Sequence, residues 1–148
     1  MNSNCKILLV IFVAILFCCC GNNAKKVGDA EEYFIKGTEY YEQEDYEQAF
    51  NMWQKAAEQG HAGAQNNLGY CYSKGEGVAK DYSKAVYWYT KAAWQGLAEA
   101  QYNLGLCYAN GDGVAKDYSK AVYWYTKAAE QGDKVAQWML ENLRKMGY

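Results

Sequence analysis

The sequence contains no proline and only one histidine among its 148 residues. Proline breaks or kinks helices, so its absence permits long helical stretches. The charges are nearly balanced, because 15 Lys and Arg stand against 17 Asp and Glu, and no basic stripe is present to attract a nucleic acid. We therefore expect no nucleic-acid partner.

Recognisable catalytic motifs are also lacking. The chain has no Gly-x-Ser-x-Gly nucleophile motif and no Cys/His cluster with the spacing of a metal site. Nothing in the sequence combines a nucleophile, a base and an oxyanion site. The single histidine, His61, precedes a predicted helix, where capping or surface placement explains it better than catalysis does. We expect no catalytic residue, no metal and no cofactor, and predict that the protein is not an enzyme.

No apolar run is long enough to span a bilayer, which requires about 20 residues. The longest run, ILLVIFVAILF at 7–17, follows Lys6 and has the length and flanks of the apolar region in a secretory signal. We predict that residues 1–20 are a signal peptide and that the protein is exported. Residues 21–30 are small, polar and unperiodic, as a flexible tether would be.

The end of this apolar segment resembles a bacterial lipobox. The stretch Leu16-Phe17-Cys18-Cys19 places a leucine three residues before Cys19, which would become the lipidated first residue of the mature chain. Cys20 is the next candidate. The resemblance implies a membrane-anchored lipoprotein of the cell envelope. Plain signal cleavage, which would give a periplasmic or secreted protein, is the alternative.

A repeat of 36 residues dominates the rest of the chain. The segment VAKDYSKAVYWYTKAA occupies 78–93 and recurs unchanged at 114–129. A fixed period of this size is typical of stacked repeat arrays. Other positions recur at the same offset, among them Gly60/Gly96/Gly132, Ala64/Ala100/Ala136, Gln65/Gln101/Gln137 and Leu68/Leu104/Leu140. We predict an all-α solenoid of stacked helix-turn-helix repeats.

Each repeat is predicted to hold two helices, A and B. Ala64, Leu68 and Tyr72 lie at four-residue intervals, on one face of helix A. Helix B has a similar stripe that begins at Tyr82 and includes Tyr89. The recurring glycines that follow the B helices suit the left-handed residue after a helix end. The predicted N-caps of the B helices are Asp45, Asp81 and Asp117.

Two glycines, Gly69 and Gly105, fall inside helix A of successive repeats. Glycine in a helix interior costs about 1 kcal/mol relative to alanine, so its recurrence needs a reason. We predict that an aromatic ring or a neighbouring backbone packs where the side chain would be.

The repeat divides the chain into four predicted units after the tether. A shorter helix pair covers 31–59, two full repeats cover 60–95 and 96–131, and a C-terminal capping helix covers 132–148. The cap has no B helix after it, and terminal repeats require a polar outer face. Its outward residues are predicted to be Glu141, Arg144 and Lys145.

The repeated pattern A-x-A-Q-x-N-L-G-x-x-Y-x-x-G-x-G-V-x-x-D-Y-x-x-A-x-x-W-Y-x-K-A-A-x-Q-G resembles the Sel1-like repeat family, a branch of the tetratricopeptide superfamily. It covers 62–96 and 98–132, and the resemblance extends over roughly residues 30–146. The first unit is more similar to an ordinary tetratricopeptide repeat. The family implies an α/α superhelix that acts as a protein-interaction scaffold, with the A helices lining its concave surface.

Residues that vary between repeats on helix A are the candidate binding contacts. They form two ladders, Asn66/Tyr102/Trp138 and Tyr70/Leu106. Large aromatic side chains dominate binding hot spots, so all five are predicted to contact a protein or peptide ligand on the concave face. The polar residues predicted to orient the backbone of that ligand are Asn66, Asn67, Asn103 and Gln101.

Other aromatic residues receive different assignments. Tyr87, Trp94 and Tyr123 vary on helix B and are predicted to lie on the outer face, where they contact a partner or membrane or only cover the surface. The residues at family-type positions are predicted to pack in the core, as aromatic stripes at helical spacing do. These are Trp88, Tyr89, Trp124 and Tyr125.

Cys71 and Cys107 occupy one position in successive repeats. Packed helices lie about 8–10 Å apart, whereas a disulfide requires Cα atoms within about 7 Å. The Helicobacter cysteine-rich relatives pair two cysteines within a unit, but here each unit holds one. We predict that both thiols are free and buried as small apolar groups.

The sequence as a whole predicts an exported, lipid-anchored scaffold that binds a protein or peptide through its concave face. Two alternatives stay open. Some exported relatives are described as penicillin-binding or β-lactam-hydrolysing proteins, which would make this chain a hydrolase. The array could instead be a structural protein of the envelope that associates with itself.

Overall fold

The computed structural model describes residues 29–148. The predicted signal peptide, both candidate lipidation sites and most of the tether lie outside the described residues. The described residues form helices joined by turns and loops, with no strand, which confirms the all-α prediction. The first helix covers 29–42 in its described part, and it is followed by α2 (Tyr46–Glu58), α3 (Ala62–Lys74), α4 (Tyr82–Trp94), α5 (Ala98–Asn110), α6 (Tyr118–Glu130) and α7 (Lys134–Lys145).

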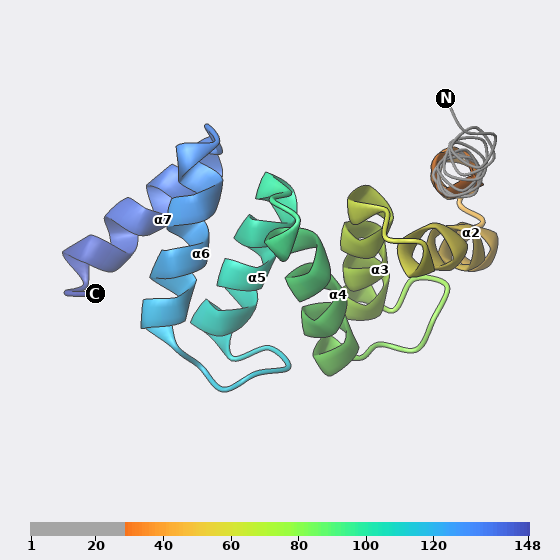
Figure 1. The fold of residues 1–148 in the computed structure, drawn as a ribbon. Coiled ribbons are helices and arrows are strands. Elements are labelled where there is room, and N and C mark those ends of the chain that lie inside the picture. Colours follow the sequence, from red (N-terminus) through yellow and green to blue (C-terminus); the bar gives the residue numbers. More distant parts are fainter. Residues whose placement is uncertain (1–28) are drawn as a thin grey trace, which may run out of the picture.

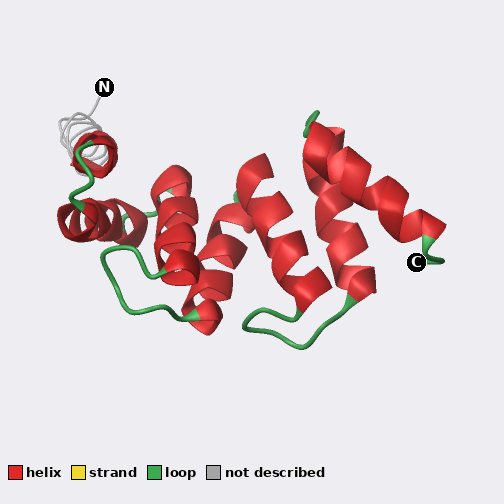
Figure 2. Ribbon diagram, turned by 180° about the vertical axis from the view of Figure 1, so that it is seen from behind, coloured by secondary structure: helices red, strands yellow, loops and turns green. Residues whose placement is uncertain are grey.

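The helices stack in chain order into a curved array (Figure 1). From α2 to α7 each helix packs on the next, so the contacts are local and pass from one pair to its neighbour. The longer loops, 75–81 and 111–117, lie along one edge of the array (Figures 1 and 2). This is the solenoid of stacked helical repeats that the 36-residue period predicts.

Helix ends are determined by the residues that recur. The carboxylates of Asp45, Asp81 and Asp117 each accept a hydrogen bond from the backbone N–H three residues on, at 3.2, 3.1 and 3.0 Å. His61 caps α3, because its Nδ1 accepts from the backbone N–H of Ala64 at 3.1 Å. These bonds satisfy N–H groups that have no partner within the helix. The predicted caps are confirmed.

A close contact between a glycine and an aromatic ring joins helices A and B of each repeat. A Cβ placed on Gly69 would lie 2.5 Å from Cδ1 of Tyr89, and one on Gly105 would lie 2.8 Å from Cδ1 of Tyr125. In the first pair, the side chain of Trp53 occupies the same space beside Gly37. The prediction that an aromatic ring packs against these glycines is confirmed.

Glutamine side chains connect one repeat to the next. Gln65 Nε2 donates to the backbone oxygen of Ala57 at 3.1 Å, and Gln95 Nε2 donates to Gln65 Oε1 at 2.7 Å. The following repeat has the same arrangement, with Gln101 donating to Ala93 O at 3.1 Å and Gln131 donating to Gln101 Oε1 at 2.8 Å. Each buried glutamine is thereby satisfied, as burial requires.

Both ends of the array are charged where the internal helices are apolar. On the first helix, Glu32 and Lys36 occupy the positions of Ala64 and Leu68, and they pair with each other at 2.6 Å. On α7, Glu141, Arg144 and Lys145 are exposed, as predicted for a cap. Charged end faces favour water over further stacking.

The boundary of the tether needs a correction. Residues 29 and 30 belong to the first helix, and Ala30 is buried. Burial of a small apolar side chain extends the helix past the boundary that polarity alone suggested. None of the described helices has the length and apolar character needed to cross a bilayer.

We predict that Gly69→Ala destabilises the protein by about 1–3 kcal/mol, because the added methyl group overlaps the ring of Tyr89. Helix propensity alone predicts the opposite, a gain of about 1 kcal/mol. Urea unfolding monitored by circular dichroism measures the difference.

The control is the same substitution in a Tyr89→Leu background, where the ring is absent. There the glycine-to-alanine change should be neutral or stabilising. Stabilisation of the otherwise unaltered chain by Gly69→Ala would show that the ring contact does not limit this position.

Candidate binding surface

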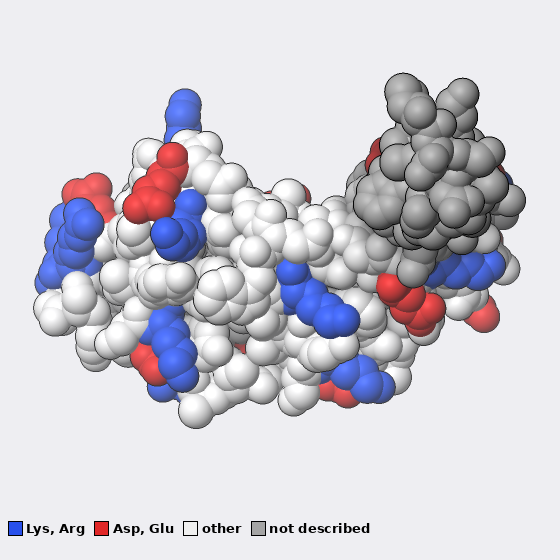
Figure 3. Space-filling model, in the orientation of Figure 1, with Lys and Arg blue, Asp and Glu red and all other residues white. Residues whose placement is uncertain are grey.

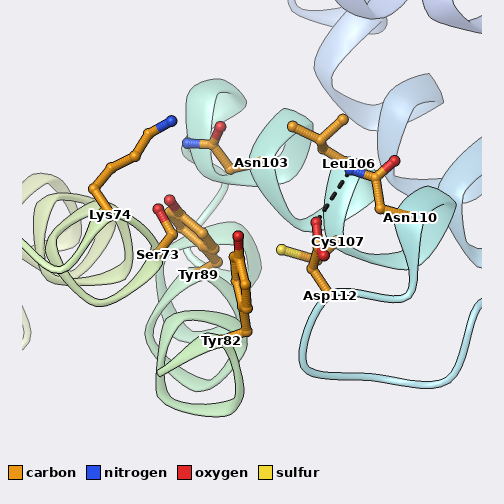
Figure 4. Close-up of a pocket in the computed structure, with 9 residues that line it drawn as sticks. All are labelled: Ser73, Lys74, Tyr82, Tyr89, Asn103, Leu106, Cys107, Asn110 and Asp112. Carbon is orange, nitrogen blue, oxygen red and sulfur yellow. Dashed lines mark hydrogen bonds between the residues drawn. The ribbon is translucent and has the colours of Figure 1, made fainter. Parts of the chain in front are cut away.

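An open pocket of about 220 Å³ lies between two successive A helices, α3 and α5, with α4 at its base (Figure 4). α3 contributes Ser73 and Lys74 from its last turn, and α4 contributes Tyr82 and Tyr89. The opposite wall consists of Asn103, Leu106, Cys107 and Asn110 of α5, with Asp112 from the following loop. The pocket exists because α4 packs behind the two A helices and leaves the space between their exposed sides open.

The pocket is lined mainly by neutral hydrogen-bonding groups. The ring of Tyr82 stands beside that of Tyr89, and the amide of Asn103 lies across from both hydroxyl groups (Figure 4). Asn110 Nδ2 donates to Asp112 Oδ2 at 3.1 Å. Burial raises the pKa of the Tyr89 phenol, so this hydroxyl stays protonated. Such hydroxyl and amide groups suit the N–H and C=O groups of a peptide better than a charged ligand.

Of the Tyr70/Leu106 ladder, Leu106 lines this pocket and Tyr70 does not. Leu106 lines it directly and is half-buried. Tyr70 is exposed on α3, one turn before Lys74, whose Nζ lies 5.8 Å from the centre of the tyrosine ring. Leu106 therefore provides apolar surface in the pocket and Tyr70 an exposed ring on α3 outside it, and the role of both in binding stays a prediction.

The placement of Asn66 on the binding surface is wrong. Only 2% of Asn66 is exposed, and its Oδ1 accepts a hydrogen bond from Asn103 Nδ2 at 3.0 Å. The hydrogen bond to Asn103 of α5 joins the two A helices at this buried position. Gln101 is also buried, in the glutamine contacts between repeats. Of the polar residues proposed to orient a ligand, Asn103 lines the pocket. Asn67, which follows Asn66 in the sequence, is half-buried and does not line it.

The two aromatic members of the other ladder lie away from the pocket. Tyr102 is half-buried and packs on Tyr125, with ring centres 5.8 Å apart. Trp138 lies on α7 and is 60% exposed. The equivalent position in α3 is covered by the next A helix, and no described helix follows α7. The ladder thus runs through the stacking face between repeats, and only its last member is on the surface.

Seven of the nine residues that line the pocket were not predicted as contacts: Ser73, Lys74, Tyr82, Tyr89, Cys107, Asn110 and Asp112. Lys74 and Asn110 occupy equivalent positions and differ between repeats, so the criterion that selected Tyr70 could have found them. Tyr82 gives no such signal, because it belongs to the segment that repeats without change and resembles a core residue.

Cys71 and Cys107 are buried free thiols, as predicted. Burial raises the pKa of each thiol to about 12. A thiol with so high a pKa is a poor nucleophile at neutral pH. Within residues 29–148, no group of three His, Cys, Asp or Glu side chains is arranged to hold a metal ion.

We predict that neither thiol is alkylated by iodoacetamide in the folded protein at pH 8, where a pKa of about 12 leaves about one thiolate in ten thousand. Both should react once guanidinium unfolds the chain and their pKa returns to the ordinary range. Mass spectrometry of tryptic peptides distinguishes them from the other cysteines. Rapid labelling of Cys71 in the folded state would contradict the burial.

Three consecutive segments of the chain, 26–61, 62–97 and 98–133, match the family model described as Sel1 repeat. The first segment contains the unit that is more similar to an ordinary tetratricopeptide repeat by sequence, so this unit is assigned to the same type as the other two. No curated protein is detectably similar to the chain.

Solved structures share the fold. The protective antigen c5321 of uropathogenic Escherichia coli, which displays an SLR fold, is 38% identical with a TM-score of 0.79, over 81% of this chain and 27% of its own. A Sel1 repeat protein from Oxalobacter formigenes is 44% identical with a TM-score of 0.74, over 77% of this chain and 47% of its own. Cysteine rich protein B of Helicobacter pylori is 32% identical with a TM-score of 0.59, over 62% of this chain and 69% of its own.

The chain thus spans about a quarter of the Escherichia coli neighbour and about half of the Oxalobacter one. The glycine–aromatic contacts, the caps and the order of stacking all follow the 36-residue unit that the family model matches. With three consecutive repeats that cover most of its length, the chain belongs to the Sel1 repeat family.

Proposed function

We propose that the protein is a scaffold that binds an extended protein or peptide segment in the pocket between α3 and α5. Sel1 and tetratricopeptide-like repeats generally mediate protein interactions, which supports the class of function. The observation that carries the proposal is the pocket itself, where neutral hydrogen-bonding groups of three helices surround Leu106. A peptide backbone offers the donors and acceptors that these groups require.

The charge distribution supports a ligand segment that carries little net charge. On the face shown in Figure 3, charged side chains of both signs are scattered, with wide uncharged surface between them. At the pocket, Lys74 and Asp112 stand on different walls and their charges offset each other. A strongly acidic or basic ligand would find no field of opposite sign here, so neither nucleic acid nor a polyanionic tail is the proposed ligand.

We also propose that the protein is exported and held at a membrane through a lipid on Cys19, or on Cys20. The support is the sequence: an eleven-residue apolar run after Lys6, followed directly by cysteines. The Escherichia coli neighbour is described as a protective antigen, which is compatible with an exported location. The scaffold would then present its pocket to partners in the envelope or outside the cell.

A hydrolytic function has less support. The buried thiols of Cys71 and Cys107 have a pKa near 12, which opposes a thiolate nucleophile. His61 is engaged at α3, where it caps the helix and its Nε2 lies 3.1 Å from Glu31 Oε2. No nucleophile in the described residues is activated by a base, so no observation favours β-lactam hydrolysis.

We predict that peptides selected from a random displayed library against the full chain lose about tenfold or more in affinity when Leu106→Arg fills the pocket. Tyr70→Ala and Tyr82→Ala should each weaken the same peptides by a smaller factor. Isothermal titration measures the dissociation constants. The matched control is Asn51→Ala, an exposed substitution on α2 that should change nothing. Selected peptides that bind Leu106→Arg as well as the unaltered chain would place recognition elsewhere.

We predict that Cys19→Ala abolishes membrane association in a bacterial host. Intact mass should show an acyl-sized increase on the unaltered chain that the variant lacks, and flotation should move the variant from the membrane to the soluble fraction. Cys20→Ala is the control and should stay at the membrane. If Cys20 carries the lipid, Cys20→Ala loses the membrane association and Cys19→Ala keeps it. A soluble, unacylated product from the unaltered chain would remove the anchor and leave a secreted binder.

A further inference from the structure

The outward stripes of the B helices are aromatic and basic on two helices but not on the third. On α4 the stripe consists of Lys84, Tyr87, Lys91 and Trp94, and every one of these residues is exposed. On α6 the equivalent residues are Lys120, Tyr123, Lys127 and Glu130. On α2 they are Gln48, Asn51, Lys55 and Glu58, with no aromatic residue. We call the stripes of α4 and α6 together the outer face.

The exposed rings of the outer face are large and held in place. Trp94 is 69% exposed, Tyr87 53% and Tyr123 46%. Trp94 and Tyr123 both meet Trp124 edge to face, with ring centres 5.1 and 5.0 Å apart, and Tyr87 meets Trp88 at 5.1 Å. Because Trp94 on α4 contacts Trp124 on α6, the aromatic surface is continuous across the two repeats.

The charges beside these rings are predominantly positive. α4 contains no acidic residue, and the two stripes together hold four lysines and one glutamate. Lys91 Nζ lies 4.9 Å from the ring centre of Tyr87, and Lys127 Nζ lies 5.9 Å from that of Tyr123. Lys127 pairs with Glu130 at 3.7 Å, and Lys84 and Lys120 pair with the cap carboxylates of Asp81 and Asp117 at 3.7 and 3.5 Å. Lys91 has no acidic partner in the described residues. The rest of the molecule is acidic overall, since the chain carries a formal charge of −2.

Tyrosine, tryptophan and lysine are the side chains that settle at the boundary between a bilayer and water. The rings enter the headgroup region while their polar ends stay hydrated. Lysine extends its charged end toward phosphate groups, and anionic lipids attract it. None of the residues of the outer face lines the pocket: α4 contributes Tyr82 and Tyr89 to the pocket, and its exposed stripe consists of other residues of the same helix.

The chain between the candidate anchor and the first helix restricts the distance to the membrane. Nine residues lie between Cys19 and residue 29, and the ten Cα–Cα steps that join the two span at most about 35 Å. We propose that the outer face of α4 and α6 rests on the bilayer surface and contacts anionic headgroups. The proposal rests on the lipid anchor for this proximity, and it leaves the pocket turned toward the aqueous side.

Two exposed tryptophans on different surfaces make the proposal testable. Trp94 belongs to the outer face, and Trp138 lies on α7 outside it with a similar exposure. The full chain is reconstituted in vesicles of phosphatidylcholine and phosphatidylglycerol whose acyl chains carry bromine, a quencher of tryptophan fluorescence. We expect Trp94→Phe to reduce the lipid-dependent quenching about twofold or more, because interfacial tryptophans reach the acyl boundary. Trp138→Phe should leave it unchanged.

Substitutions that keep Trp94 as the fluorescent reporter give a second measure of lipid contact. Tyr87→Ser with Tyr123→Ser should reduce the quenching of Trp94, whereas Asn51→Ser on α2 is the matched control. Lys91→Gln with Lys127→Gln should reduce the difference between vesicles with and without phosphatidylglycerol. Circular dichroism confirms that each variant is folded.

The possible outcomes separate the anchor from the face. An acylated chain that floats with the vesicles but shows no loss of quenching in Trp94→Phe overturns the face and retains the anchor. A chain without acyl mass overturns the anchor. The same chain is then added to the vesicles from solution, where Trp94-dependent quenching supports the face and its absence overturns it. If Trp94 becomes shielded from solvent as the protein concentration rises in the absence of vesicles, the outer face binds a second copy of the chain. This result would overturn the proposal.

Discussion

The contact between an in-helix glycine and an aromatic ring determines how closely helices A and B approach. Tyr89 and Tyr125 lie where the side chains of Gly69 and Gly105 would be, and Trp53 does the same beside Gly37. A repeated close approach gives each pair the same geometry, so the pairs stack with a constant offset. The pocket depends on this spacing, because the same Tyr89 that packs on Gly69 also forms its base.

Polar side chains between repeats stabilise the stacking of one helix pair on the next. The buried glutamines bond to backbone oxygens and to one another, and Asn66 bonds to Asn103. A buried amide without partners would cost about 1–3 kcal/mol, so these bonds favour one register between neighbouring pairs. Two side chains have a buried polar atom without a partner in the described residues, Trp53 at its Nε1 and Tyr125 at its hydroxyl, and both belong to the glycine–aromatic contacts.

The pocket and the outer face share α4 but use different residues of it, which allows one chain to engage a ligand and a membrane at once. A helices provide most of the pocket walls, and B helices provide the exposed rings and lysines. An aromatic surface held against a bilayer would orient the array, and the pocket would then face away from the lipid. The lipid anchor would hold the chain at the membrane, the outer face would contact the bilayer, and the pocket would bind the ligand.

The sequence by itself determined the all-α solenoid, the caps and the ring beside each in-helix glycine, because all of these repeat at a fixed offset and depend on local chemistry. It also separated Tyr70 and Leu106 from the core by their variation. It could not place Asn66, Tyr102 and Trp138, which share one position but differ in burial. Their exposure depends on whether another helix packs over that side, and only the tertiary structure decides this. The same holds for Tyr82, whose unchanged recurrence resembles a core residue until the gap between α3 and α5 exposes it.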